Sequence, residues 1–457
     1  MSKISDFSST SARQSVELAI QRAKEANETY NFAISLTEAR ALERAGKVES
    51  GEITGRLAGV PFIAKDNFLT FGGTTTAASK ILSNFEAPLQ ATAIEKLEAE
   101  GAICIGKANL DAFAHGGSTE NSAYGPTKNA HDQTKVAGGS SGGSAVSVAL
   151  DIVPFALGSD TGGSIRQPAS FNGVVGIKPT YGTVSRYGVV AMASSTDVIG
   201  AFTTDSTDAE LVMSIIAGKD AKDMTTIDDF FAPEAVKPGQ KIGLIKEFMT
   251  DDVDPEVRAA TLAYAEKLKA AGHTVSEVSL PIVKYTLAMY YIIVPAEISS
   301  NLGRYDGIRY GKRAEAGSLS ELYGKSRDEG FMTENKRRIM IGSFVLSSGY
   351  FDAYYLQAQK ARTLLINELN ELFGQYDALI GPVAPTPAFA LGENSSDPIK
   401  MYLADVMTVP ASLAGVPAIS VPAGVSSTGL PIGVQLIGQR RSDAALLALS
   451  GSLEGSI

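Results

Sequence analysis

Short apolar runs and longer amphipathic stretches alternate along most of this chain. Short apolar runs predict buried strands, whereas apolar residues that recur with a helical period predict helices packed on one face. The predicted strands cover residues 60–64, 103–106, 153–157, 174–177, 241–245, 273–278, 378–382, 419–422 and 433–437. The predicted helices cover residues 12–27, 38–45, 88–100, 144–150, 205–217 and 255–271. Strands that alternate with helices indicate an α/β fold with a mainly parallel sheet.

The second half of the chain has a different pattern. Residues 283–374 are mostly helical in pattern and rich in Tyr, Arg and Lys, which predicts a helical layer on the sheet. Residues 219–239 are polar, with an acidic patch and two prolines. This segment is the best candidate for a boundary between sub-domains, although it lacks the composition of a true linker.

Composition and charge exclude several classes of protein. The chain has no apolar run long enough for a membrane span and no apolar segment of a signal peptide near its start. Its single cysteine, Cys104, excludes an internal disulfide and fits a reducing compartment, so we expect a cytoplasmic protein. No cluster of cysteine and histidine is present for a thiolate zinc site. The net charge of −10 argues against this chain binding a nucleic acid without a partner.

Residues 136–166 hold two clusters of glycine and serine, at 138–144 and 160–164. Glycine is costly in backbone entropy, so this density indicates a geometric requirement. Such loops let backbone N–H groups and small hydroxyls converge on one point. We interpret this point as the place where an amide carbonyl is attacked.

Two familiar loop types fit these clusters poorly. The stretch lacks the lysine of a phosphate-binding P-loop and the acidic partner of a dinucleotide-binding loop. The residues around Ser141 match the G-x-S-x-G elbow of α/β-hydrolases, which needs a histidine downstream. Of the three histidines, His115, His131 and His273, only His273 follows Ser141, so a Ser-His-Asp hydrolase is disfavoured.

A serine nucleophile with a lysine base remains. A lysine acts as a base only when it is neutral, and burial lowers its pKa. Lys65 follows a buried strand, Ser140 could relay a proton, and Ser164 follows glycines whose N–H groups could form an oxyanion hole. Taken singly, Lys65 could instead reach solvent and Ser164 could cap a helix.

Three motifs together resemble the amidase signature family. They are VPFIAKDN at 60–67, GGSSGGS at 138–144 and SDTGGSIRQPA at 159–169. Within this family, further stretches resemble the glutamine-hydrolysing subunits of amidotransferases that act on Glu-tRNA(Gln) or Asp-tRNA(Asn). These stretches are GGSTENSAYGP, VVGIKPTYGTVSRYGVVAMASS, KRRIMIGSFVLSSGYFDAYY and MYLADVMTVPASLAGVPAISVPAG.

The resemblance implies a Ser–cis-Ser–Lys triad. Ser164 would be the nucleophile, Ser140 the bridging serine after a cis peptide, and Lys65 the general base. The oxyanion hole would come from the backbone N–H groups of Thr161, Gly162, Gly163 and Ser164. The glutamine pocket would include Tyr290, Arg338, Asp405 and Gly116. The sequence does not decide between Arg337 and Arg338, or between Tyr290 and Tyr291, as the residue that faces the substrate.

Two positions depart from the pattern of the resembling subunits. His115 stands where methionine is expected, and Gly117 where serine is expected. Both lie in the loop near the expected pocket and neither belongs to the triad.

The implied fold is a single amidase signature domain over residues 1–457, with its core at about 57–200 and a helical layer at about 283–374. It would be an α/β/α sandwich around a large mixed, mainly parallel sheet. The implied assembly is a heterotrimer with a tRNA-binding kinase and transamidase subunit and a small third subunit. Glutamine would be the substrate here, whereas the partner would bind tRNA, ATP and Mg²⁺, so this chain would need no metal or cofactor. The alternatives are a free-standing amidase for other carboxamides and a non-catalytic binding protein.

Overall fold

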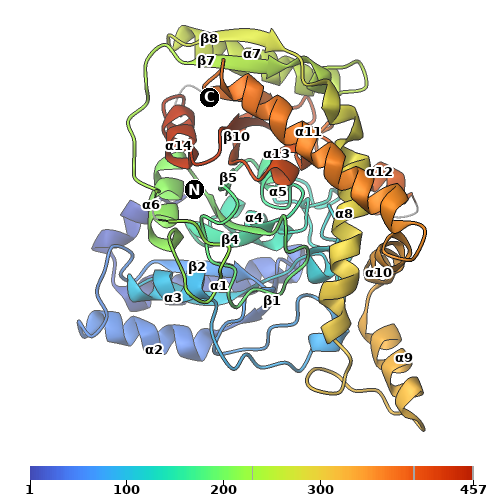
Figure 1. The fold of residues 1–457 in the computed structure, drawn as a ribbon. Coiled ribbons are helices and arrows are strands. Elements are labelled where there is room, and N and C mark those ends of the chain that lie inside the picture. The colour runs from blue at the N-terminus through green and yellow to red at the C-terminus, as the bar shows by residue number, and fades with distance from the viewer. Residues whose placement is uncertain (229, 395–396, 455–457) are drawn as a thin grey trace.

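One mixed sheet extends through the whole molecule (Figure 1). The computed structural model describes residues 1–228, 230–394 and 397–454. The sheet has 11 strands in the order β1-β3-β2-β4-β6-β5-β10-β11-β9-β7-β8. Their bounds are β1 Ala33–Leu36, β2 Pro61–Lys65, β3 Ile103–Ala108, β4 Phe155–Asp160, β5 Val175–Lys178, β6 Val198–Thr203, β7 Lys241–Ile245, β8 Thr274–Val278, β9 Ala378–Pro382, β10 Ala418–Val425 and β11 Pro431–Gly438.

Helices cover both faces of this sheet. Their bounds are α1 Ala12–Tyr30, α2 Glu38–Glu49, α3 Thr92–Ala99, α4 Gly142–Ala149, α5 Arg166–Asn172, α6 Ser206–Ile216, α7 Pro255–Ala270, α8 Thr286–Asn301, α9 Leu319–Gly330, α10 Thr333–Val345, α11 Leu356–Phe373, α12 Pro398–Leu403, α13 Val409–Ala414 and α14 Asp443–Gly451. Because successive side chains of a strand point to opposite faces, Phe62 packs with α3 and α6 while Ile63 packs with α1 and α4. The first face also carries α7 and α14. This arrangement is the predicted α/β/α sandwich.

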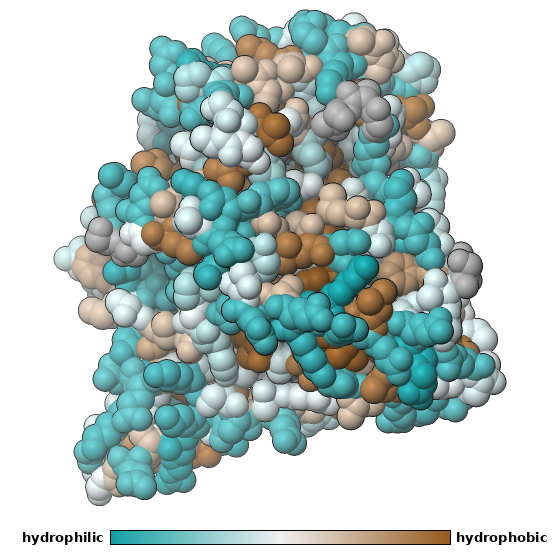
Figure 2. All heavy atoms as spheres, turned by 180° about the vertical axis from the view of Figure 1, so that it is seen from behind, coloured by the Kyte–Doolittle hydropathy of each residue, from teal (hydrophilic) through white to brown (hydrophobic). Residues whose placement is uncertain are grey.

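The segment at 283–374 contains α8, α9, α10 and α11, in agreement with its helical pattern. Leu379 of β9 packs in one hydrophobic cluster with residues of α8, α11 and α13, so these helices cover the second face of the sheet beside α4. Helix α9 lies at the periphery of this layer (Figure 1). In the reverse view the same projecting part, at lower left, is mostly hydrophilic (Figure 2).

The prediction that the sheet is mainly parallel is wrong. Among the described strands, four pairings are parallel, β2 with β3 and β4, and β7 with β8 and β9. The other six are antiparallel and include all those of β5, β6, β10 and β11. One antiparallel pair follows from a short connection. A tight turn at 426–429 joins β10 to β11, and two strands joined by a hairpin turn are antiparallel.

The polar segment at 219–239 does not separate two sheets. It leads from α6 to β7, and β10 and β11 connect the strands on either side through unbroken pairing with β5 and β9. No helix within the described residues is both long and apolar enough to span a lipid bilayer.

Candidate active site

The candidate site lies at the carboxyl ends of β2 and β4, which are neighbouring parallel strands. Lys65 is the last residue of β2, and Asp160 is the last residue of β4. The loops that follow parallel strands meet at one edge of a sheet, where α/β proteins bind ligands. The Gly/Ser loop before α4 and the loop between β4 and α5 meet at this edge.

Lys65 is fully buried and contacts two serines. Its Nζ lies 2.7 Å from Oγ of Ser140, 3.0 Å from Oγ of Ser159 and 3.3 Å from the carbonyl oxygen of Ser159. Burial lowers the pKa of Lys65 to about 7, although the carboxylates of Asp111 and Asp160 oppose this change. A substantial part of Lys65 is therefore neutral near pH 7 and able to accept a proton. The alternative in which Lys65 reaches solvent is excluded.

The bridging serine has the predicted backbone. The peptide bond between Gly139 and Ser140 is cis. A side chain at position 139 would not fit, since a Cβ would lie 2.2 Å from Oδ2 of Asp111. The carboxylate of Asp111 accepts the N–H groups of Thr119 and Asn121 at 2.9 and 3.0 Å, which holds the neighbouring loop against Gly139.

Ser164 lies in the loop between β4 and α5, residues 161–165, which we call the nucleophile loop. This loop contacts the Gly/Ser loop that holds Ser140. The carbonyl oxygen of Ser164 accepts the N–H of Ser141 at 3.2 Å. The hydroxyl of Ser164 has no hydrogen-bond partner within the described part of the chain, and the residue is 7% exposed. Ser164 does not cap α5, because the helix begins at Arg166 with Ile165 before it. The hydroxyl is thus free to meet a substrate.

The predicted oxyanion hole needs one correction. The N–H of Gly163 donates to Oδ1 of Asp160 at 2.9 Å, so it is not free to bind an oxyanion in this arrangement. The N–H groups of Thr161, Gly162 and Ser164 have no acceptor among the described residues. These three N–H groups are the available donors.

Asp160 anchors this loop through a buried ion pair. Its carboxylate accepts Nε and Nη2 of Arg166, both at 3.1 Å, and both side chains are fully buried. Burial alone would raise the pKa of Asp160, but Arg166 holds it below its ordinary value. Arg166 also donates to Gln435 of β11 at 3.0 Å and to Ser412 of α13 at 2.9 Å. The pair ties the nucleophile loop to the C-terminal strands.

The nucleophile-elbow alternative fails on geometry. The hydroxyl of Ser141 is buried and donates to the carbonyl of Ser159 at 3.2 Å. His273 lies next to β8 at the far edge of the sheet, where its Nδ1 accepts the N–H of Gln240 at 3.2 Å. His273, the one histidine that follows Ser141 in the sequence, therefore does not approach Ser141 as a base.

Arg338 is the buried member of its arginine pair. It is 3% exposed, and its Nε donates to Glu334 at 2.8 Å. Its guanidinium lies 5.2 Å from the ring centre of Tyr291 and 5.6 Å from that of Tyr402. Arg337 also pairs with Glu334, but its side chain is 40% exposed. Both arginines line one cavity, but of the two only Arg338 is buried.

The two tyrosines have different neighbours. Tyr290 faces the nucleophile loop, since a Cβ on Gly162 would lie 2.7 Å from its hydroxyl. Tyr291 lies beside Arg338 instead. Both residues thus belong to the surroundings of the site, one on the side of Ser164 and one on the side of Arg338.

Asp405 lies between the arginine and the nucleophile loop. The hydroxyl of Thr408 is 3.0 Å from the carbonyl of Asp405 and 2.6 Å from that of Gly162, which links the two segments. Burial raises the pKa of Asp405 to about 8, and Arg338 opposes this rise. A Cβ on Gly117 would lie 3.5 Å from Oδ2 of Asp405, so glycine leaves this carboxylate open where serine would approach it.

Gly116 lines a cavity of about 210 Å³ that also includes Gly117, Arg338 and Tyr402. A Cβ at position 116 would lie 2.3 Å from Cγ of Asp111, so only glycine fits there. His115, in place of the expected methionine, is buried and lines the same cavity. Its Nδ1 lies 2.7 Å from Nδ2 of Asn335, and burial beside Arg338 holds its pKa well below its ordinary value.

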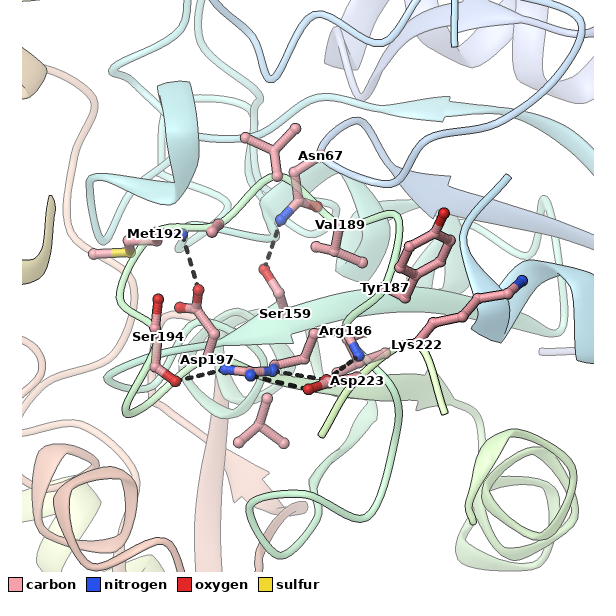
Figure 3. A pocket seen from close by; sticks show the side chains of 14 residues that line it. Asn67, Ser159, Arg186, Tyr187, Val189, Met192, Ser194, Asp197, Lys222 and Asp223 are labelled. Carbon is pink, nitrogen blue, oxygen red and sulfur yellow. Dashed lines mark hydrogen bonds and ion pairs between the residues drawn. The ribbon is translucent and has the colours of Figure 1, made fainter. Parts of the chain in front are cut away.

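Several contributors to the site were missed from the sequence. Ser159, Asn67 and Asp197 line a second cavity of about 200 Å³ (Figure 3), and Ser159 contacts Lys65. Asp160 and Arg166 hold the nucleophile loop in place through their buried ion pair and the hydrogen bond of Asp160 with the N–H of Gly163. Opposite charges on either side of a glycine pair were a signal for that ion pair; nothing local marks the other three residues.

Comparisons with known proteins found similar sequences and a similar solved structure. A sequence model of the amidase family matches residues 14–447. The chain is 51% identical over 437 residues to the A subunit of the glutamyl-tRNA(Gln) amidotransferase of Koribacter versatilis, covering 93% of this chain and 91% of that protein. It is 50% identical over 456 residues to the protein of the same name from Thermosynechococcus vestitus, covering 97% and 94%. The crystal structure of the protein of that name from Thermotoga maritima matches with a TM-score of 0.83 at 41% identity, covering 99% and 94%.

Proposed function

Because this chain belongs to the amidase family, we propose that it is the glutamine-hydrolysing subunit of a tRNA-dependent amidotransferase. One observation supports the chemistry most strongly: a buried lysine whose pKa is about 7 lies 2.7 Å from the hydroxyl of Ser140, and the next residue, Ser141, donates its N–H to the carbonyl oxygen of Ser164. The choice of glutamine and of Glu-tRNA(Gln) rests on the similarity to relatives of that name and on the charges of the pocket.

The first half of the reaction forms an ester. Neutral Lys65 accepts the proton of Ser140, which takes the proton of Ser164, and Oγ of Ser164 attacks the carboxamide carbon of glutamine. The oxygen that becomes negative is stabilised by the N–H groups of Thr161, Gly162 and Ser164, and each such donor is worth about 3 kcal/mol. The carbon–nitrogen bond then breaks, the amine takes a proton back from Lys65 through Ser140, and ammonia leaves. The product on the protein is a glutamyl ester of Ser164.

The second half releases glutamate. Water attacks the ester carbonyl and gives its proton to Ser140 and Lys65, and the proton returns to Oγ of Ser164 as the ester bond breaks. The net reaction is glutamine plus water to glutamate plus ammonia. All the groups that this scheme uses belong to this chain.

The pocket fits the two charged ends of glutamine. Arg338 has Nη1 and Nη2 unpaired among the described residues, so its bidentate face is available to the α-carboxylate. Asp405 would take the ammonium group, and Gly116 and Tyr290 would line the pocket on either side. A bound ammonium favours the charged form of Asp405 and lowers its pKa.

The rest of the reaction would take place on partners. We propose a hetero-oligomer in which a second subunit binds the tRNA, activates the mischarged glutamate with ATP and Mg²⁺, and uses the ammonia made here, with a small third subunit. The net charge of −10 is consistent with a chain that leaves the tRNA to its partner. We place the assembly in the cytoplasm.

A free-standing amidase for other carboxamides is the second candidate, because it would share the triad. The pocket argues against it: a neutral amide has no use for a buried arginine and a carboxylate placed on either side of its binding site. Affinity purification of the full chain from its source cell decides between the two. We expect co-purification of a tRNA-binding subunit and a small subunit, and ATP-dependent amidation of Glu-tRNA(Gln) by the mixture with glutamine as donor. A chain that purifies alone and hydrolyses neutral carboxamides as well as glutamine would be the amidase.

Replacing Arg338 with alanine should raise the KM for glutamine by about a hundredfold, since losing one member of a buried charge pair costs about 3 kcal/mol. Glu334 would keep Arg337 and the hydroxyl of Tyr402 as partners, so the helix should remain folded. Arg337→Ala is the matched control, because it removes a neighbouring but exposed arginine and should leave KM unchanged. Steady-state glutaminase assays on both variants check this, and equal effects of the two would contradict the assignment of Arg338.

A further inference from the structure

We propose that Asn67 is a positioning residue that directs the lone pair of Lys65 toward Ser140 by fixing the hydroxyl of Ser159. This inference rests on the proposed function, in which Lys65 is the base. It assigns a task to a residue that lies outside the triad and outside the glutamine pocket.

The three side chains form one buried chain of contacts behind the triad. Asn67 follows β2 two residues after Lys65 and is 2% exposed. Its Nδ2 donates to Oγ of Ser159 at 3.0 Å, and Nζ of Lys65 lies 3.0 Å from the same oxygen. Figure 3 shows the Asn67 and Ser159 side chains pointing toward one another across the wall of the second cavity.

The direction of the lone pair of Lys65 depends on where its two N–H groups find acceptors. A neutral amine has two N–H bonds and one lone pair. To accept a proton from Ser140, the lone pair must face Oγ of Ser140, 2.7 Å away. The two N–H groups then need acceptors, and Oγ and the carbonyl oxygen of Ser159 are those within reach, at 3.0 and 3.3 Å.

Ser159 could disturb this arrangement by donating its own proton. A hydroxyl has one proton and two lone pairs, so an unrestrained Ser159 could direct its O–H at the lone pair of Lys65 and compete with Ser140. The amide of Asn67 prevents this. With N–H groups of Asn67 and Lys65 on its two lone pairs, Ser159 must turn its proton away from Lys65, toward the cavity that it lines.

The charged groups around Lys65 do not determine its orientation. The carboxylates that act on its pKa are Asp111 after β3, Asp160 at the end of β4 and Asp197 before β6. None of them is within hydrogen-bond distance of Nζ among the described contacts. Asp197, for example, accepts the hydroxyl of Thr161 at 2.8 Å and the N–H of Met192 at 2.8 Å. The orientation of the amine therefore depends on the neutral groups Ser140, Ser159 and Asn67.

Two substitutions in the assembled amidotransferase test this role. Asn67→Leu keeps the approximate size but frees the hydroxyl of Ser159, so kcat for glutamine hydrolysis should fall about tenfold with KM unchanged. Asn67→Asp places a carboxylate beside Ser159, which favours protonated Lys65. The rising limb of the pH profile should then move up by about one unit, and activity should recover at higher pH.

A double-mutant cycle shows whether Asn67 acts through Ser159. Ser159→Ala removes the hydroxyl, so adding Asn67→Leu to that variant should cause no further loss of kcat. If Asn67 had only a structural role, Asn67→Leu would lower kcat by the same factor with and without Ser159→Ala. The rising limb of the pH profile would then stay at its wild-type position.

The proposal is overturned if Asn67→Leu retains full kcat, if its loss is independent of Ser159, or if Asn67→Asp titrates like the wild type. Thermal unfolding and gel filtration show whether each variant assembles, and where Asn67→Leu does not, the pH profile of Asn67→Asp decides. A wild-type complex without glutaminase activity, or with activity that survives loss of Lys65, would instead refute the proposed function.

Discussion

Glutamine hydrolysis is expected to fall by about a millionfold when Ser164 is replaced with alanine, the scale on which serine hydrolases lose activity with their nucleophile. The Ser164 hydroxyl makes no hydrogen bond within the described chain, so its removal leaves no buried group unpaired and stability should not change. Ammonia release from the assembled complex measures the loss.

Two controls accompany this variant. Ser147→Ala removes another buried serine of the same stretch, which donates to the carbonyl of Ser144 at 2.8 Å, and it should keep full activity. Supplying an ammonium salt to the Ser164→Ala complex should restore amidation of Glu-tRNA(Gln), because only the source of ammonia is lost. Glutamine hydrolysis at an undiminished rate in Ser164→Ala would rule out this nucleophile.

Lys65→Met should lower kcat by about a thousandfold, within the usual contribution of a general base. The pH dependence of the wild-type protein should show the titration of the same lysine. Lys65 accepts a proton only when neutral, and its pKa is about 7, so kcat/KM rises as the pH increases through about 7. Asp405 must be ionised to hold an ammonium group, and its pKa of about 8 extends the same rise. Stopped-time glutaminase assays from acid to alkaline pH measure this profile.

Lys178 provides a matched control for the lysine. It is equally buried at the end of β5, its pKa is also lowered to about 7, and its Nζ donates to the carbonyl of Pro179 at 2.9 Å rather than to a serine. Lys178→Met should therefore keep the rising limb, whatever it does to stability. If the limb near pH 7 vanished in Lys178→Met and survived in Lys65→Met, the base would be misassigned.

The sequence predicted best the parts of the fold that depend on local pattern. The ranges of β7 and β9 were predicted to the residue, because each is a short, mostly apolar run that follows a polar residue, Gln240 or Asp377. Helix α3 begins at Thr92 rather than near Pro88, since the chain before it is held by loop contacts such as that of Ala91 N–H with Leu69. Strands β1 and β6 were missed: β1 has only four residues, and β6 contains Gly200, which weakens its apolar run. Apart from the hairpin of β10 and β11, the antiparallel pairs join strands that are distant in the sequence or connected by long segments, so they have no local signal.

The triad could be proposed from sequence because its three members lie in distinctive stretches. The cis peptide before Ser140 and the contact of Lys65 with Ser140 agree with that proposal. The involvement of Gly163 with Asp160 could not be foreseen, since it depends on how the carboxylate lies beneath its own loop. The contact of Asn67 with Ser159 could not be predicted either, because these residues are 92 positions apart and meet only when β2 pairs with β4.

The central claim is that Ser164 carries the glutamyl group during the reaction. Acid quenching of the complex within the first turnovers, followed by digestion and mass spectrometry, tests this directly. We predict a peptide containing Ser164 whose mass is increased by one glutamyl group, present with glutamine and absent from Ser164→Ala. Finding that increment on another residue, or steady glutamine turnover with Ser164 always unmodified, would contradict the account.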